Sequence, residues 1–125
     1  MANGIKHLIQ SNTKLLSYCE DASNWVEFGA GCGTFTLPLS QLLDHLTAVE
    51  SSSTSKHNLQ RALKHHSIDN VTVSSLNVQH QTDQACELLR RSDGIFANPR
   101  RSGLEPIIQT LEKIEYPPLY IIYVS

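Results

Sequence analysis

The chain has 125 residues, of which 40% are hydrophobic and 18% are charged, and its formal net charge is -2. This length predicts one domain over residues 1–125 with one core, and the balanced charge excludes a polybasic nucleic-acid tail and an acidic block. The chain has no run of about 18 apolar residues and no secretory leader pattern, so no membrane partner and a cytosolic location are expected.

The three cysteines, Cys19, Cys32 and Cys86, are scattered and form no C-x-x-C pair. This spacing argues against a disulfide framework and against a zinc site. We expect reduced thiols and no metal centre. Cys32 lies within a glycine-rich segment, but no base is placed beside it in the sequence, so it is not expected to be a nucleophile.

Short β-rich apolar runs alternate along the chain with segments of helical periodicity. This alternation predicts an α/β fold, a Rossmann-like central parallel sheet of about five strands with helices on both faces. Strands are expected at residues 25–28, 46–50, 71–73, 95–97 and 119–124. Helices are expected at residues 5–19, from Phe35 through Leu43 with Pro38 in the first turn, after a cap within 51–55, from a cap at Thr82 or Asp83 to 91, and at 105–116.

Three alternating glycines, Gly29, Gly31 and Gly33, follow the first expected strand, which has the acid Glu27 next to its last residue. Glycines at such a strand-to-helix turn let the backbone bend tightly and let a ligand lie against the peptide groups, where a Cβ would collide with it. The segment therefore predicts a nucleotide-cofactor loop.

A second acid, Glu50, closes the next expected strand about 20 residues further on, where a carboxylate can accept hydrogen bonds from both ribose hydroxyls. The glycines follow a G-x-G-x-G pattern and not the G-x-G-x-x-G pattern of a dinucleotide site. Together with the acid before them, this pattern favours S-adenosylmethionine over a nicotinamide cofactor.

Polar residues also follow the third and fourth expected strands. Asn77 is placed where an amide could bind the amino group of adenine. Asn98, followed by Pro99, provides a rigid carboxamide suited to hold a planar base over the cofactor, and Arg100 and Arg101 could pair with phosphates.

Five stretches of the chain carry a resemblance to a known family. Residues 8–12 resemble its FxQxN segment, residues 27–39 its DLYCGxGNFSLPLA loop, residues 48–50 its ribose-binding strand, residues 98–104 its DPPRSGL motif, and residues 122–125 the strand before its SCNP motif. The chain thus resembles the RNA uracil-5 methyltransferases, which make 5-methyluridine in transfer and ribosomal RNA. It departs from the family pattern at Thr34, Asn98 and Arg100, where the family has Asn, Asp and Pro.

The resemblance implies S-adenosylmethionine as cofactor and RNA as partner. Asn98 would lie between the methyl donor and the target base, and Arg101 would help to position that base. The cofactor-binding residues expected from the motifs and the resemblance are Gln10, Glu27, Gly29, Gly31, Gly33, Thr34, Glu50, Asn77 and Asn98.

The family's cysteine nucleophile and general base lie downstream of the position that corresponds to Ser125. The resemblance therefore implies a C-terminally truncated domain that lacks the last two family strands, contains no catalytic residue and is inactive alone. The strand from Tyr120 to Val124 would then be an apolar edge and a site of self-association.

Two alternatives remain open from the sequence. Asn98-Pro99 resembles part of the motif of amino-group methyltransferases, although Arg100-Arg101 in place of Pro-aromatic counts against them. The other alternative is a non-catalytic remnant that serves as a cofactor-binding or dimerisation module.

Overall fold

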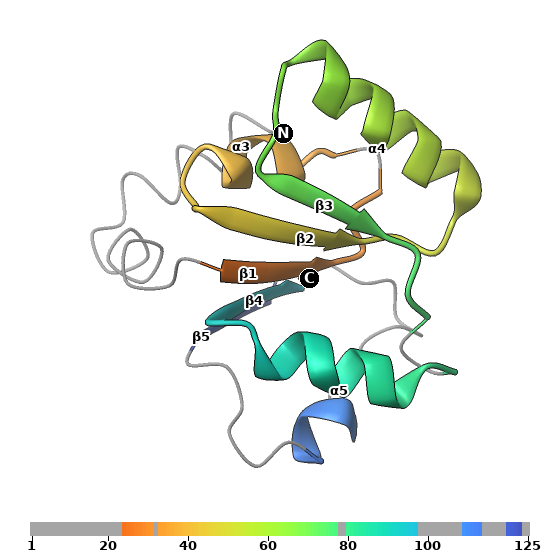
Figure 1. Cartoon of the computed structure of the whole chain (residues 1–125), viewed down its shortest axis with the longest axis vertical. Coiled ribbons are helices and arrows are strands. Elements are labelled where there is room, and N and C mark those ends of the chain that lie inside the picture. Colours follow the sequence, from red (N-terminus) through yellow and green to blue (C-terminus); the bar gives the residue numbers. More distant parts are fainter. Residues whose placement is uncertain (1–23, 32, 78–79, 98–108, 114–119, 124–125) are drawn as a thin grey trace.

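Figure 1 shows the computed structural model of the chain, which describes residues 24–31, 33–77, 80–97, 109–113 and 120–123. A sheet of five parallel strands, in the order β3-β2-β1-β4-β5, forms its centre. The strands are β1 (Asn24–Phe28), β2 (His45–Val49), β3 (Val71–Ser74), β4 (Gly94–Ala97) and β5 (Tyr120–Tyr123). The predicted parallel sheet of about five strands is confirmed.

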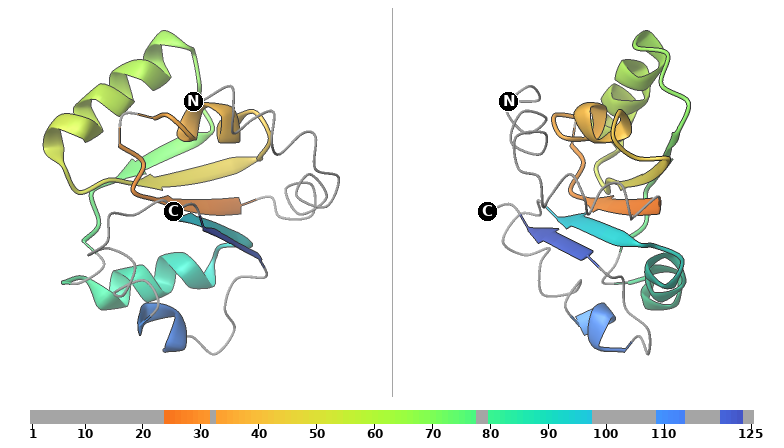
Figure 2. Two further views of the ribbon diagram at one scale, coloured as in Figure 1. Left: turned by 180° about the vertical axis from the view of Figure 1, so that it is seen from behind. Right: turned by 90° about the vertical axis from the view of Figure 1, so that its left-hand side faces the viewer.

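Helices lie on both faces of this sheet. Figures 1 and 2 show α3 (Thr36–Ser40) and α4 (Ser53–His65) over one face and α5 (Thr82–Arg90) over the other. Residues 109–112 are also helical and lie on the same side as α5, drawn in blue. The predicted two-sided cover is therefore present.

Adjacent residues of each strand point to opposite faces, and this alternation divides the core. Trp25 and Phe96 pack with the leucines of and after α3 on one face. Val26 and Ile95, which are paired in register on β1 and β4, pack with Cys86 and Leu89 of α5 on the other face. Trp25 is thus a packing residue. Glu27 shares the Trp25 parity, so its side chain belongs to the α3 and α4 face.

The strand order places the ends of three strands together. The chain runs outward from β1 to β2 and β3, and then returns to β4 on the other side of β1. Phe28 is opposite both Val49 and Ala97, so β1, β2 and β4 end at one level. We call this the carboxyl edge of the sheet, and the edge where Asn24, His45 and Gly94 lie the amino edge. In such sheets ligands bind at the carboxyl edge, near the point where the strand order reverses.

Helix α4 begins at the carboxyl edge and covers the sheet. The hydroxyl of its N-cap residue, Ser52, accepts a hydrogen bond from the Ser55 backbone N–H at 3.3 Å, which confirms the cap expected within residues 51–55. Leu59 and Leu63 are buried beside Ala30 and Ala48. The two inward leucines, four residues apart, fix the helix and leave its opposite side to solvent.

Helix α3 is shorter than predicted. It ends at Ser40, and Leu42 and Leu43, which were expected within it, lie after its end. The cause is a partner distant in sequence, because the Asn70 side-chain amide donates to the carbonyls of Ser40 at 2.7 Å and Leu43 at 3.0 Å. Because these carbonyls accept hydrogen bonds from Asn70, they do not need the N–H donors that a further helical turn would supply.

The predicted start of α5 is also corrected. Its N-cap is Gln81 and no side chain caps it, whereas Thr82 or Asp83 was expected in that role. The Gln81 side chain instead accepts a hydrogen bond from the Asn77 backbone N–H at 2.8 Å. Asp83 lies in the first helical turn, where its charge complements the helix dipole.

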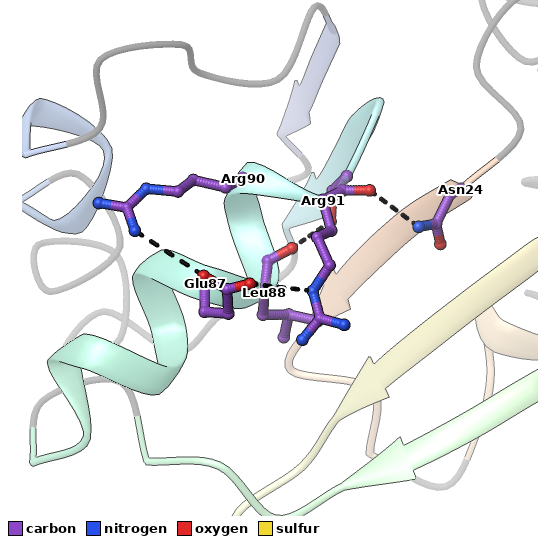
Figure 3. Close-up of polar contacts among 6 residues, drawn as sticks. Asn24, Glu87, Leu88, Arg90 and Arg91 are labelled. Carbon is purple, nitrogen blue, oxygen red and sulfur yellow. Dashed lines mark hydrogen bonds and ion pairs between the residues drawn. The ribbon is translucent and has the colours of Figure 1, made fainter.

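A polar network closes the amino edge. The Asn24 backbone N–H donates to Asp93 Oδ2 at 2.9 Å, and the Asp93 N–H donates to the Asn24 carbonyl at 2.7 Å. The His45 ring lies between Asn24 Oδ1, at 3.2 Å, and Thr72 Oγ1, at 3.0 Å. Figure 3 shows that the Asn24 side chain also donates to the Arg91 carbonyl at the end of α5. The network joins the beginnings of β1, β2 and β4.

Some expected elements lie partly or wholly outside the described residues. The helix expected at 5–19 lies outside them, and only residues 109–112 of the one expected at 105–116 are described as helical. Within the described ranges, no helix has the length and apolar character that a bilayer crossing requires.

Candidate cofactor site

The glycine loop leaves the sheet at the end of β1 in a left-handed conformation. Gly29, Gly31 and Gly33 have φ angles of 77°, 59° and 103°, which residues with a side chain rarely adopt. The backbone N–H groups of Gly29 and Ala30 both donate to the Val49 carbonyl, at 3.2 and 3.3 Å. These bonds hold the loop against the end of β2.

Gly31 and Gly33 differ in what surrounds them. A Cβ added at Gly31 would meet no atom of the described residues within 4 Å, so they leave open space beside this peptide. A Cβ added at Gly33 would lie 2.9 Å from Leu59 Cδ1 in the core. None of the described residues thus fills the space beside Gly31, whereas Gly33 allows the loop to pack closely on α4.

Glu27 is a fully buried acid beneath the loop. The Thr36 hydroxyl, at the first residue of α3, donates to its Oε1 at 2.5 Å. Its Oε2 is also buried and has no hydrogen-bond partner in the described part of the chain. A buried carboxylate oxygen without a partner is costly in a protein interior, so protonation of Glu27 or a hydrogen-bond donor beside Oε2 would lower this cost.

Burial raises the pKa of Glu27 from 4.5 to about 7. The Thr36 hydrogen bond opposes this rise, and the nearby charge of Glu50 adds to it. The carboxyl group is thus close to half-protonated at neutral pH. A donor or cation beside Oε2 would favour the ionised form.

Glu50 follows β2 directly and is half-buried at the same edge. Its Oε1 accepts a hydrogen bond from the Gly31 N–H at 2.8 Å, and its Oε2 accepts one from the Ser52 N–H at 2.8 Å. The carboxylate thus connects the glycine loop to the start of α4. Each of its oxygens keeps acceptor capacity, since an ionised carboxylate has about four lone-pair sites.

The structure therefore brings together the loop glycines, Glu27 and Glu50 at the carboxyl edge. Two residues that sequence reasoning missed complete the arrangement. Thr36 binds Glu27, and the Ser52 backbone binds Glu50. The signal for Thr36 was available, because a hydroxyl at the start of the helix that follows such a loop can reach back to an acid before it.

Two further predicted residues are described, and both are exposed. Thr34 lies in the turn after Gly33. Asn77 lies beyond β3, where its Oδ1 accepts a hydrogen bond from the His80 N–H at 3.3 Å. Their proposed contacts with the cofactor stay predictions.

The remaining predicted residues, Gln10, Asn98, Arg100 and Arg101, lie outside the described residues, as does Cys32. Cys86 is a free, buried cysteine of the α5 core. Over the described ranges, no group of three or more His, Cys, Asp and Glu residues is arranged to hold a metal ion.

Several curated proteins are similar to the chain in sequence, although no protein-family model matches it. The 23S rRNA (uracil(1939)-C(5))-methyltransferase RlmD of Aliivibrio salmonicida is 28% identical over 96% of this chain and 29% of that protein. The tRNA/tmRNA (uracil-C(5))-methyltransferase of Pseudomonas putida is 30% identical over 84% of this chain and 35% of that protein. The chain spans about a third of the length of these relatives.

Solved methyltransferase structures share its fold. A dimethyladenosine transferase from Plasmodium falciparum superposes with a TM-score of 0.65 and 16% identity, over 90% of this chain and 42% of that one. An rRNA methylase from Streptococcus thermophilus superposes with a TM-score of 0.62 and 15% identity, over 86% of this chain and 68% of that one. The fold is thus the Rossmann-like class I methyltransferase fold, and by its sequence relatives the chain belongs to the RNA uracil-C5 methyltransferase family.

Proposed function

We propose that this chain is the S-adenosylmethionine-binding part of an RNA methyltransferase that acts on C5 of uridine in transfer or ribosomal RNA. The observation that carries the proposal is the contact between the Glu50 carboxylate and the Gly31 peptide, at the edge where β1 and β2 end. An acid in that position is suited to a ribose, and the sequence relatives are named for uracil-C5 methyl transfer.

The residues at this edge fit the cofactor. The free lone pairs of Glu50 would accept hydrogen bonds from the ribose hydroxyls, and the open space beside Gly31 would receive the nucleoside. The unpartnered Oε2 of Glu27 would accept a hydrogen bond from a donor of the ligand. When bound, S-adenosylmethionine supplies an electrophilic methyl group. The contributions of Gln10, Thr34, Asn77 and Asn98 to this pocket rest on their motifs.

The substrate proposal rests on the sequence relatives. Their names support RNA as partner and C5 of uracil as acceptor, over the amino-group alternative. Asn98 and Arg101 would position the base. We further propose a cytosolic location, and self-association through the strand from Tyr120 to Val124, which is supported by the place of β5 at one end of the sheet.

The test is a calorimetric titration with S-adenosylhomocysteine and with its 2′-deoxyribose analogue, on the unaltered chain and on Glu50→Gln. If Glu50 binds the ribose, the unaltered chain prefers the hydroxylated ligand by about tenfold, because the carboxylate loses a hydrogen-bond partner in the analogue. In Glu50→Gln the affinity for S-adenosylhomocysteine falls by a similar factor and the preference nearly disappears.

The preference between the two ligands separates ribose binding from a purely structural role of Glu50. Loss of its bonds to Gly31 and Ser52 would weaken both ligands equally. Asp69→Asn is the matched control, since it removes an exposed carboxylate at the other end of α4 and should change neither affinity. Equal binding of the two ligands by the unaltered chain would contradict the proposed ribose site.

A further inference from the structure

The solvent side of α4 concentrates positive charge. Residues 51–68 contain Lys56, Arg61 and Lys64 and three of the chain's six histidines, but none of its 12 acidic residues. The segment thus carries three cationic side chains in a chain whose net charge is -2. Such a separation of charge is unusual for a helix face that is only solvated, because these faces commonly mix both signs.

The basic residues form one stripe along the exposed side. His57, Arg61, Lys64 and His65 are exposed, and their spacing of four, three and one residues places them on one side of the helix, opposite Leu59 and Leu63. None of these side chains forms an ion pair with a carboxylate of the described residues. We call these four residues the α4 stripe.

A shallow hollow lies along the second half of this stripe. It has a volume of about 580 Å³ and is lined by Asn58, Arg61, Ala62, Lys64, His65 and His66. The His65 and His66 rings meet edge to face, with their centroids 5.1 Å apart. The lining offers cations, an amide and imidazole rings, which are groups that contact phosphates and bases. It contains no apolar side chain larger than Ala62.

Helix α5 differs from α4 because its basic residues have an acidic partner nearby. Its Arg90 and the following Arg91 both pair with Glu87, at 3.8 and 3.4 Å, as Figure 3 shows. These arginines are exposed, but their charge is partly neutralised. The α4 stripe has no such partner on its own helix.

The stripe also begins close to the candidate site. Ser52, at the start of α4, donates its backbone N–H to Glu50, and the helix then runs from the carboxyl edge toward the amino edge. His57 and Lys64 are about 10 Å apart along the axis, at about 1.5 Å per residue, a length that covers about two or three phosphates of one nucleic-acid strand. A strand that leaves the site could continue along α4.

We propose that the α4 stripe binds the phosphate backbone of the RNA substrate, outside the cofactor pocket. This inference rests on the proposed function for the identity of the polyanion. The positive charge of the α4 stripe is complementary to a polyanion. The hollow beside it is lined by no apolar side chain larger than Ala62, which favours RNA over a protein partner.

The test measures the affinity of the chain for a short, fluorescently labelled, uridine-containing single-stranded RNA over a range of salt concentrations. The variant is Arg61→Gln with Lys64→Gln, and the matched control is Arg90→Gln with Arg91→Gln, which removes the same charge from α5. The α4 variant should weaken binding about tenfold and reduce the slope of log K against log salt by about 1.4, or 0.7 per lost phosphate contact. The α5 control should leave this slope unchanged.

Three outcomes would overturn the proposal. Equal weakening of RNA binding by both variants would indicate a general charge effect. If the unaltered chain does not bind the RNA, the α4 stripe is not an RNA-binding surface. Binding to anionic phospholipid vesicles that depends on Arg61 and Lys64, with RNA binding unaffected, would assign the surface to a membrane. S-Adenosylhomocysteine titrations on the same samples test the proposed function separately, since these variants lie outside the cofactor site.

Discussion

The two edges of the sheet use polar residues in opposite ways. At the amino edge, Asn24, His45 and Asp93 bind one another or backbone groups, so the network is complete within the protein. At the carboxyl edge, Glu27 keeps a buried oxygen without a partner among the described residues, and Gly31 borders open space. Polar groups that are satisfied internally stabilise a fold, whereas the unsatisfied oxygen of Glu27 lies at the edge where we propose that the cofactor binds.

The largest expected effect concerns Glu27 and pH. Its pKa in the folded chain is about 7, above its ordinary value of 4.5, so between these values the folded state holds a proton that the unfolded state has lost. Stability therefore falls as pH rises through this window and levels off above about 7. The full change is on the order of 3 kcal/mol, at about 1.4 kcal/mol per pKa unit.

Glu27→Gln should abolish this contribution. The variant should match the unaltered chain near pH 5 and be more stable near pH 8, by an amount on the order of 3 kcal/mol. Urea unfolding of both chains across this range measures the difference. Parallel stability curves would show that the Glu27 carboxyl is not buried as described, and the contrast between the two edges would fail.

The next effect separates two glycines of the same loop. Gly33→Ala should cost about 2 kcal/mol of unfolding free energy, because φ is 103° and the new Cβ would crowd Leu59. Gly31→Ala should cost only about 1 kcal/mol, since its Cβ would lie in open space. Thermal unfolding compares the two variants.

The order of the two glycine variants should differ between ligand affinity and unfolding free energy. Gly31→Ala should weaken S-adenosylhomocysteine binding more than its small effect on folding suggests, because the added methyl group would occupy space proposed for the nucleoside. Unchanged affinity in this variant would mean that the open space beside Gly31 is not the cofactor pocket.

The smallest expected effect on stability concerns Asn70, at the amino edge of the sheet. Asn70→Ala removes the amide that binds the Ser40 and Leu43 carbonyls and should cost about 1 kcal/mol. Its affinity for S-adenosylhomocysteine should not change, since Asn70 stabilises the end of α3 and lies away from the loop. A loss of affinity comparable to that of Gly31→Ala would erase the distinction between the edges.

The sequence predicted those features that depend on local pattern. Alternating apolar runs predicted the five parallel strands, and Glu27, the three glycines and Glu50 were recognised by their spacing alone. Each strand end is a local signal, and parallel topology then brings the ends of β1 and β2 to one edge.

Features that depend on distant contacts were not predictable in this way. Helix α3 ends early because Asn70, 30 residues away, takes the Ser40 carbonyl. The start of α5 was misplaced because its N-cap residue, Gln81, makes no side-chain capping bond and its side chain instead binds the Asn77 peptide. The missing partner of Glu27 Oε2 was equally hidden, since burial follows from the packing of α3 and α4 over one face.

The three loop glycines all have positive φ angles, and this has a consequence for chemical synthesis. At Gly31 the backbone has the φ angle that a D-amino acid prefers, so a semisynthetic chain with D-alanine there would avoid the torsional penalty of its mirror image. The methyl group of D-alanine would replace the other α-hydrogen of glycine. This variant would therefore keep the turn without strain and leave unfilled the space that an L-alanine methyl group would occupy.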